Sequence, residues 1–114
     1  MSLYDPTRVK SMLGETGTSN DSKILTYGTM ADNFVIGDLV KVKGLPNPPA
    51  VTVGVLTQAE LDNIKLHATL ITVSYFYKFE SGDTITAEAA ELSWKQYYQN
   101  KFKSPRFITS TGSI

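Results

Sequence analysis

The chain has 114 residues, of which 41% are hydrophobic and 19% charged, a composition typical of one globular domain with its own core. Eleven basic and eleven acidic side chains give a formal net charge of zero, which excludes the global positive field that drives non-specific binding to nucleic acid. There is no cysteine, so disulfides, thiolate nucleophiles and cysteine-based zinc sites are excluded as well. We therefore predict a single domain over residues 1–114, with residues 104–114 as an extended C-terminal tail.

The sequence gives no sign of a targeting or membrane-spanning segment. Its amino terminus lacks the apolar run of a signal peptide, and no stretch approaches the ~18 consecutive apolar residues that a transmembrane helix needs. We expect a soluble protein that is made and used in the cytoplasm.

A short helix is expected first, over residues 6–13. Asp5 is a good N-cap, Pro6 is a favoured first helical residue, and Gly14 is suited to end the helix. Three apolar side chains could face a core: Val9, Met12 and Leu13.

A second helix should follow the polar linker, with Ser19, Asn20 and Asp21 as alternative N-caps. Apolar side chains then recur at steps of three and four residues, which marks one helical face: Ile24, Tyr27, Ala31, Phe34 and Val35. Gly28 lies on the same face. Because a glycine inside a helix costs about 1 kcal/mol relative to alanine, we expect a neighbouring helix to approach closely there.

Gly44 and three prolines interrupt the helical pattern between residues 41 and 55, so we predict a long loop there, with short extended pieces at "VKV" and "VTV". Loops of this length without structure of their own are usually functional or mobile. Two interpretations stay open: a passive solvent loop, or a loop that contacts a partner subunit.

The third helix has the clearest start signal in the chain. Thr57 and Glu60 have the spacing of a capping box, and the sequence Ser81-Gly82-Asp83 can end the helix. One apolar face comprises Leu61, Ile64, Ala68, Ile71 and Tyr75, and a second comprises Leu66, Leu70, Val73 and Tyr77. A helix that is apolar on two faces is normally buried on both, so this should be the central helix.

The fourth helix should pair antiparallel with the third across a short turn. Its apolar face comprises Ala87, Ala90, Trp94, Tyr97 and Tyr98. This pairing predicts Tyr75, Phe76 and Phe79 near the early turns of the last helix, and the Trp94 cluster near the middle of the third. Large rings would then fill the space between helices of unequal length.

The residues that could carry chemistry do not form a recognisable site. His67 is the only histidine and needs no role beyond that of a helix residue, Asp32 and Asp38 lack the spacing that would join them on one helical face, and Glu88 and Glu91 lie on a face that looks solvated. Neither of the common glycine-rich phosphate-binding motifs occurs. We expect no enzyme activity, no cofactor and no metal ion.

Together these elements predict an all-α fold: a small four-helix bundle, made of a short N-terminal helix and three longer ones, with a long Pro-rich loop between the second and third helices.

The order of these elements resembles that of the head-to-tail connector, or adaptor, proteins of tailed phages, a family of head completion proteins. The similarity runs from Leu3 to about Phe107 and rests on the segments "DPTRVKSML", "NDSKI", "ADNFV", "LPNPP", "LDNIKLHATLITVSYFYKFESGD" and "AAELSWKQYYQNKF". The resemblance implies a virion component at the phage neck, one subunit of an oligomeric ring that links the portal to the tail and extends the DNA channel.

The same resemblance implies the partners. They would be the portal protein, neighbouring copies in a ring of about 12, a tail or stopper protein, and genomic DNA that passes without sequence-specific contact, with no membrane involved. The protein would be found in the virion neck, and in the host cytoplasm during assembly. A ring requires two different faces of one subunit to meet, and a net charge near zero suits a channel wall that must not hold DNA.

We place the portal or subunit interface in the loop and the tail, because these segments hold apolar and basic residues that a monomer does not need. The candidate residues are Leu45, Pro46, Pro48, Pro49, Val51, Val53, Arg106, Phe107 and Ile108. The tail after Pro105 is either a free end or a segment that becomes ordered on a partner.

Two alternatives remain. One is a small helical DNA-binding module, for which the basic residues Lys95, Lys101, Lys103 and Arg106 would be needed. The other is a small regulatory or interaction protein unrelated to phage assembly.

Overall fold

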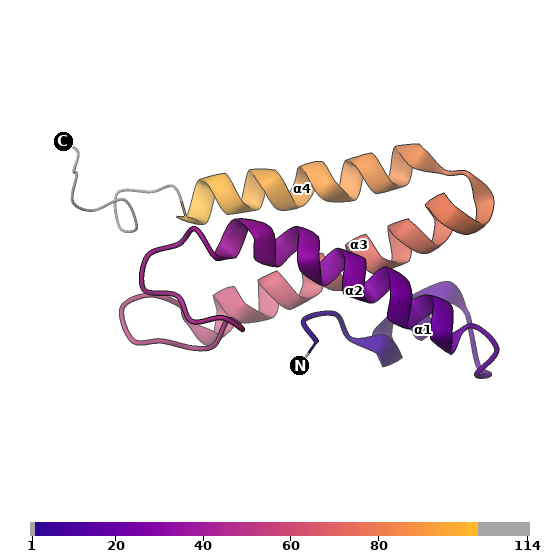
Figure 1. Cartoon of the computed structure of the whole chain (residues 1–114), viewed down its shortest axis with the longest axis horizontal. Coiled ribbons are helices and arrows are strands. Elements are labelled where there is room, and N and C mark those ends of the chain that lie inside the picture. Colours follow the sequence, from indigo (N-terminus) through magenta and orange to yellow (C-terminus); the bar gives the residue numbers. More distant parts are fainter. Residues whose placement is uncertain (1, 103–114) are drawn as a thin grey trace.

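The computed structural model describes residues 2–102, and four α-helices make up most of this range (Figure 1). They are α1 (Pro6–Leu13), α2 (Asp21–Leu39), α3 (Gln58–Ser81) and α4 (Thr84–Phe102). No strand occurs among residues 2–102, where the only pairing of that kind is an isolated bridge between Thr52 and Leu56. The prediction of an all-α helical bundle is confirmed, whereas the extended pieces expected within the loop form no strand.

The helix ends follow the predicted caps. The Asp5 side chain accepts hydrogen bonds from the backbone N–H groups of Thr7 and Arg8 at the start of α1. At the start of α3, Thr57 and Glu60 form the complete capping box. Gly82 caps the end of the helix, with a φ of 74° in the left-handed region that glycine adopts most readily. These local bonds fix where the chain turns between helices.

The central position of α3 is confirmed, since α3 contacts α1, α2 and α4. Its first predicted face is buried along its whole length: Leu61, Ile64, Ala68, Ile71 and Tyr75. The second face differs from the prediction. Leu66 and Val73 are half-buried, while Leu70 and Tyr77 are 39% and 38% exposed, because α4 covers only part of this side of α3.

The N-terminal segment is packed into the fold ahead of α1. Leu3 and Tyr4 are buried, and their backbone N–H groups donate to the two carboxylate oxygens of Asp32 at 3.1 Å. In α1, Val9 is completely buried but Met12, predicted as a core residue, is 38% exposed. A helix of eight residues presents a narrow buried face, and Met12 lies outside it.

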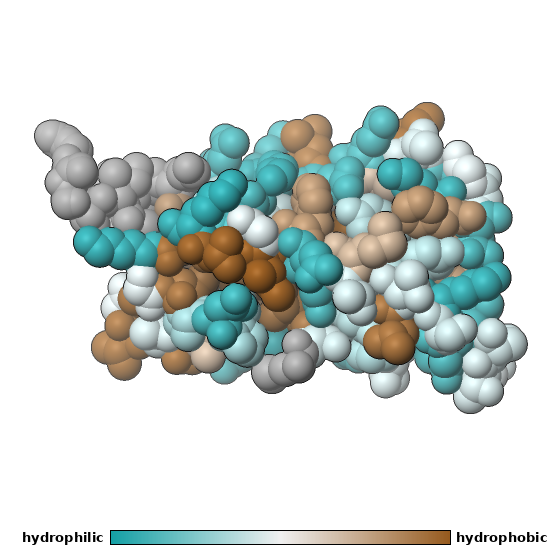
Figure 2. All heavy atoms as spheres, viewed as in Figure 1, coloured by the Kyte–Doolittle hydropathy of each residue, from teal (hydrophilic) through white to brown (hydrophobic). Residues whose placement is uncertain are grey.

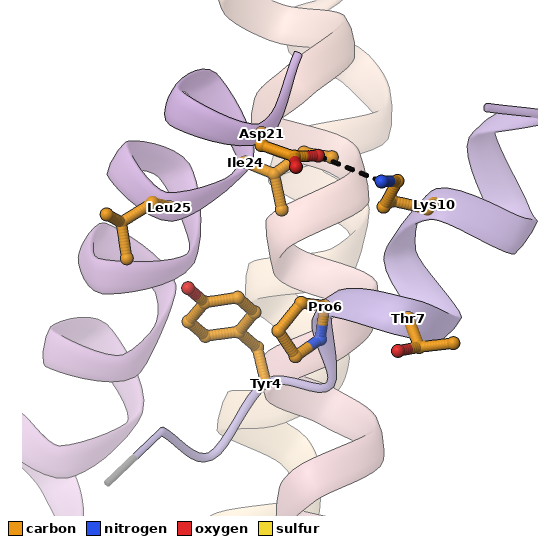
Figure 3. Close-up of a pocket in the computed structure, with 7 residues that line it drawn as sticks. All are labelled: Tyr4, Pro6, Thr7, Lys10, Asp21, Ile24 and Leu25. Atoms are coloured by element: carbon orange, nitrogen blue, oxygen red, sulfur yellow. Dashed lines mark hydrogen bonds and ion pairs between the residues drawn. The ribbon is translucent and has the colours of Figure 1, made fainter. Parts of the chain in front are cut away.

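Gly28 is needed for a close approach, although not by a helix as we predicted. A Cβ atom on Gly28 would lie 2.3 Å from Cζ of the Tyr4 ring, far inside van der Waals contact. The neighbour is therefore the aromatic ring of the N-terminal segment, which lies across α2 at this point (Figure 3).

The aromatic side chains form two groups, and the first is the predicted Trp94 cluster. Trp94 is fully buried and packs edge-on against the His67 ring with 5.7 Å between centroids, and Tyr97 lies 5.0 Å from the same ring. The Trp94 cluster thus lies at the middle of α3, as expected for an antiparallel pair.

The second aromatic group lies toward the end of α3. Phe76 and Phe79 pack on Tyr27 of α2, with centroids 5.9 Å and 5.3 Å away, a contact that the sequence analysis did not predict. Tyr75 does reach α4, where its hydroxyl donates to Glu91 at 2.5 Å. The difference arises because successive residues of a helix point about 100° apart, so neighbouring rings of α3 serve different partners.

Candidate functional site

His67 was the first residue to consider for catalysis. It is half-buried between α3 and α4 against the Trp94 and Tyr97 rings, and burial lowers its pKa below the ordinary value. Among residues 2–102 no group of three or more His, Cys, Asp or Glu side chains is placed to hold a metal ion. The environment of His67 is that of an aromatic packing partner.

Two carboxylates that the sequence analysis set aside prove to be buried. Asp38 accepts a hydrogen bond from Trp94 Nε1 at 2.8 Å, and its two oxygens lie 3.0 Å and 2.8 Å from Lys95 Nζ. Lys95 Nζ also lies 4.9 Å from the centroid of the Phe34 ring. Asp38 therefore ties α2 to α4 through one neutral and one charged donor.

Asp32 has the corresponding role at the amino terminus. Burial raises the pKa of Asp32, although the hydrogen bonds from Leu3 and Tyr4 favour the carboxylate and act in the opposite direction. A sequence signal for both residues existed. Although they are not three or four residues from each other, each is so spaced from a residue of the buried stripe, Asp32 from Gly28 and Asp38 from Val35. An acidic residue on such a stripe needs a buried partner, which makes both residues structural.

A shallow pocket of about 350 Å³ lies between the N-terminal segment, α1 and α2 (Figure 3). Its two charged groups are paired with each other, since Lys10 Nζ lies 2.9 Å from Asp21 Oδ1. The remaining lining includes Tyr4, Pro6, Ile24 and the exposed Leu25. This arrangement offers no acid, base or nucleophile poised for a reaction.

The segment between α2 and α3, residues 40–57, is anchored at its base and exposed at its tip. Val42 and Leu56 belong to the hydrophobic core at 6% and 1% exposure. At the tip, the Thr52 N–H donates to the Leu56 carbonyl and the Val55 N–H donates to the Thr52 carbonyl, both at 2.9 Å. This turn presents Val53, which is 100% exposed.

The candidate interface residues of this segment fall into two groups. Pro49 is buried and Leu45 is half-buried against the core, so both pack within the subunit itself. Exposed residues are Pro46, Pro48, Val51 and Val53. Figure 2 shows hydrophobic side chains gathered at this end of the molecule. The other three candidates, Arg106, Phe107 and Ile108, lie outside the described residues.

A second exposed apolar surface, which the sequence analysis did not single out, lies between α3 and α4. It is a groove of about 310 Å³ lined by His67, Leu70, Val73, Ser74, Thr86, Ala89, Ala90 and Ser93. Small residues on α4 leave this space open beside the larger residues of α3. The signal in the sequence was the second apolar face of α3 opposite a run of alanine and serine, which leaves part of that face exposed.

None of the helices found within residues 2–102 combines the length and the apolar character that crossing a membrane requires. Comparisons of the chain with protein-family models, with curated proteins and with solved structures find no match.

Proposed function

We propose that this protein is a structural subunit of a ring at the neck of a tailed phage, where it links the portal to the tail. The proposal starts from the resemblance of the sequence to head-to-tail connector proteins. The observation that carries it furthest is the fully exposed Val53 at the tip of a loop whose base, Val42 and Leu56, is packed in the core.

An exposed apolar side chain on a defined turn gains no stabilisation from burial in a monomer, but it would gain it in a contact with another subunit. Burial of a valine side chain contributes about 1.5–3 kcal/mol, yet Val53 gains none of this within its own subunit. Val51, 50% exposed, lies two residues away. Exposed apolar side chains clustered on one segment are typical of protein–protein contact surfaces.

A DNA-binding module would use the basic side chains near the end of α4. Of these, Lys95 is held by Asp38 through two contacts of 3.0 Å and 2.8 Å and lies over the Phe34 ring. Its charge serves the contact between α2 and α4, so it is less suited to phosphate groups. We therefore favour the structural subunit over that alternative.

The first test removes the tail. Deleting Pro105–Ile114 should leave the far-UV circular dichroism spectrum and the melting transition nearly unchanged, because the described helices end at Phe102. It should abolish co-sedimentation with purified portal particles and the production of tailed, infectious virions. Failure of the full-length chain itself to bind any portal ring would overturn the proposed function.

A matched pair of variants makes this test sharper. Replacing Arg106, Phe107 and Ile108 together by alanine should abolish docking, while the same replacement of Thr109, Ser110 and Thr111 should preserve it. Both triple variants change three adjacent tail residues, so a difference between them reports the side chains that we assign to the interface. Equal docking by both would move the docking surface to the loop or to the helices.

A further inference from the structure

We propose that the N-terminal strap, residues 3–13, opens and closes as one unit while α2, α3 and α4 stay folded, and that Asp32 is the clasp that holds it closed. The strap comprises α1 and the short segment before it. The opening would occur in a single free subunit, so it does not depend on the proposed function.

Hydrogen bonds join the strap to the rest of the protein at a few points. The N–H groups of Leu3 and Tyr4 donate to the carboxylate oxygens of Asp32, each at 3.1 Å. The N–H group of Asp5 donates to Thr69 Oγ1 at 3.0 Å. Among residues 2–102, no backbone–backbone hydrogen bond links the strap to α2, α3 or α4. The strap is therefore held by side-chain acceptors and not by a continuous ladder of main-chain bonds.

Opening leaves neither of these acceptors buried without a partner. Water would replace the strap at both oxygens of Asp32, and Thr69 Oγ1 already donates to the Lys65 carbonyl at 2.9 Å within α3. Because bonds to water replace the bonds that are lost, the net cost of breaking each one is small. The remaining ion pair of the strap, between Lys10 and Asp21, is partly exposed to solvent and contributes little.

The strap is also loosely packed against the helices beneath it. Of its residues, only Leu3, Tyr4 and Val9 are buried. The pocket of about 350 Å³ shown in Figure 3 lies between the strap and α2, and a second pocket of about 350 Å³ lies between the strap and α3. Since the interiors of folded domains are normally close-packed, an element with a hollow on each side has few contacts to lose when it opens.

The shortness of α1 makes the opening cooperative. The helix has eight residues, and a helix of this length is not stable without the packing of its neighbours. Release of Leu3 and Tyr4 from Asp32 removes the support at its start, so the clasp and the helix should open together. The linker that follows, residues 14–20, is exposed or half-buried and contains two glycines, which suits it to act as the hinge.

Opening would uncover a face of α2 that the closed strap hides. Gly28 is buried under the Tyr4 ring, and Asp32, on the next turn of the same helix, is 8% exposed. Once the strap has moved, a carboxylate and a slot shaped for one aromatic ring would face solvent. The strap thus controls access to this face of α2.

Native-state hydrogen exchange of the full chain, followed for each amide by NMR at low urea concentrations, measures this opening. The amides of residues 3–5 and 9–13 should share one opening free energy. They should exchange at least about a hundredfold faster than the amides at the centre of α3, near Ile71, after correction for intrinsic rates. Their exchange should also depend only weakly on urea, because opening the strap exposes little surface.

Two outcomes of this measurement would contradict the inference. If the strap amides exchange only as slowly as those at the centre of α3, the strap does not open separately from the rest of the fold. If α1 exchanges quickly while residues 3–5 do not, α1 unravels by itself and the strap is not one unit.

Matched substitutions of the two buried carboxylates on α2 separate opening of the strap from unfolding of the whole domain. Asp32→Asn removes one of the two acceptors of the clasp, which both events break. It should therefore speed exchange in the strap and at the centre of α3 by the same factor, at least about tenfold. Asp38→Asn weakens contacts with Trp94 and Lys95 that survive when the strap opens. It should speed exchange at the centre of α3 and leave exchange in the strap unchanged, and an equal acceleration at both places would overturn the inference.

Discussion

Replacing Trp94 by alanine should be among the most destabilising single changes in this protein. Trp94 is fully buried on α4, where it packs against His67 and Tyr98 and donates a hydrogen bond to Asp38 at 2.8 Å. The substitution therefore removes a large apolar side chain from the core and one donor from a buried carboxylate.

The expected magnitude combines two terms. Truncation of a buried tryptophan costs about 3–5 kcal/mol, and loss of a hydrogen bond to a charged group costs about 1.5–3 kcal/mol. Lys95 remains beside Asp38, so the carboxylate keeps a partner and the second term should lie near its lower limit. A total of about 4.5–6.5 kcal/mol approaches the whole stability of a small domain, ~5–15 kcal/mol.

Urea unfolding followed by far-UV circular dichroism measures this free energy, and two further variants separate its parts. Trp94→Phe retains a ring and loses only the N–H donor, so it should cost clearly less than Trp94→Ala. Gln96→Ala, at an exposed position on the same helix, should change the free energy of unfolding by no more than about 0.5 kcal/mol. A Trp94→Ala protein within about 1 kcal/mol of the parent would refute the assignment of Trp94 to the core.

Three further predictions concern other contacts. Gly28→Ala should destabilise the protein by about 1–3 kcal/mol, because the added methyl group collides with the Tyr4 ring. Gly37→Ala, in the same helix with open space around it, should instead stabilise the protein by about 0.5–1 kcal/mol. A shift of the melting temperature in the same direction for both variants would contradict this packing. Asp32→Ala should leave the backbone N–H groups of residues 3 and 4 buried without their acceptor, and the loss of each hydrogen bond should cost about 1–3 kcal/mol. Amide hydrogen exchange at these two residues should become faster, and unchanged exchange would argue against the two hydrogen bonds. Burial lowers the folded-state pKa of His67, so its contribution to the free energy of unfolding should be fully present above the unfolded pKa of about 6.5 and decrease as the pH falls from there through the folded pKa. His67→Gln should remove this part of the decrease in stability at low pH, and an identical pH profile for the variant would refute the prediction.

The helices of this protein are specified by short-range signals. The cap at Asp5 bonds to groups two and three residues away, and the capping box of Thr57 and Glu60 spans three residues. Such bonds form whenever the local backbone turns, so the sequence predicts the ends of α1 and α3 without knowledge of the rest of the fold. The apolar spacing of α3 similarly predicted its central place.

The candidate surfaces were only partly predictable. Prolines and glycine identified the segment between α2 and α3, but which of its residues are exposed depends on how Val42 and Leu56 anchor it in the core. The groove beside α3 exists because α4 presents alanine and serine there. Neither helix alone defines that space, since it is the volume that two packed surfaces leave between them.

Tertiary structure alone decided the partners of the polar and aromatic side chains. The bond between Trp94 and Asp38 joins residues 56 positions apart, and the bond from Leu3 to Asp32 joins residues 29 apart. The sequence placed Asp38 within an apolar stripe but held no information about which donor would meet it. That choice depends on the rotation and register of packed helices, which many weak contacts determine together and no local pattern encodes.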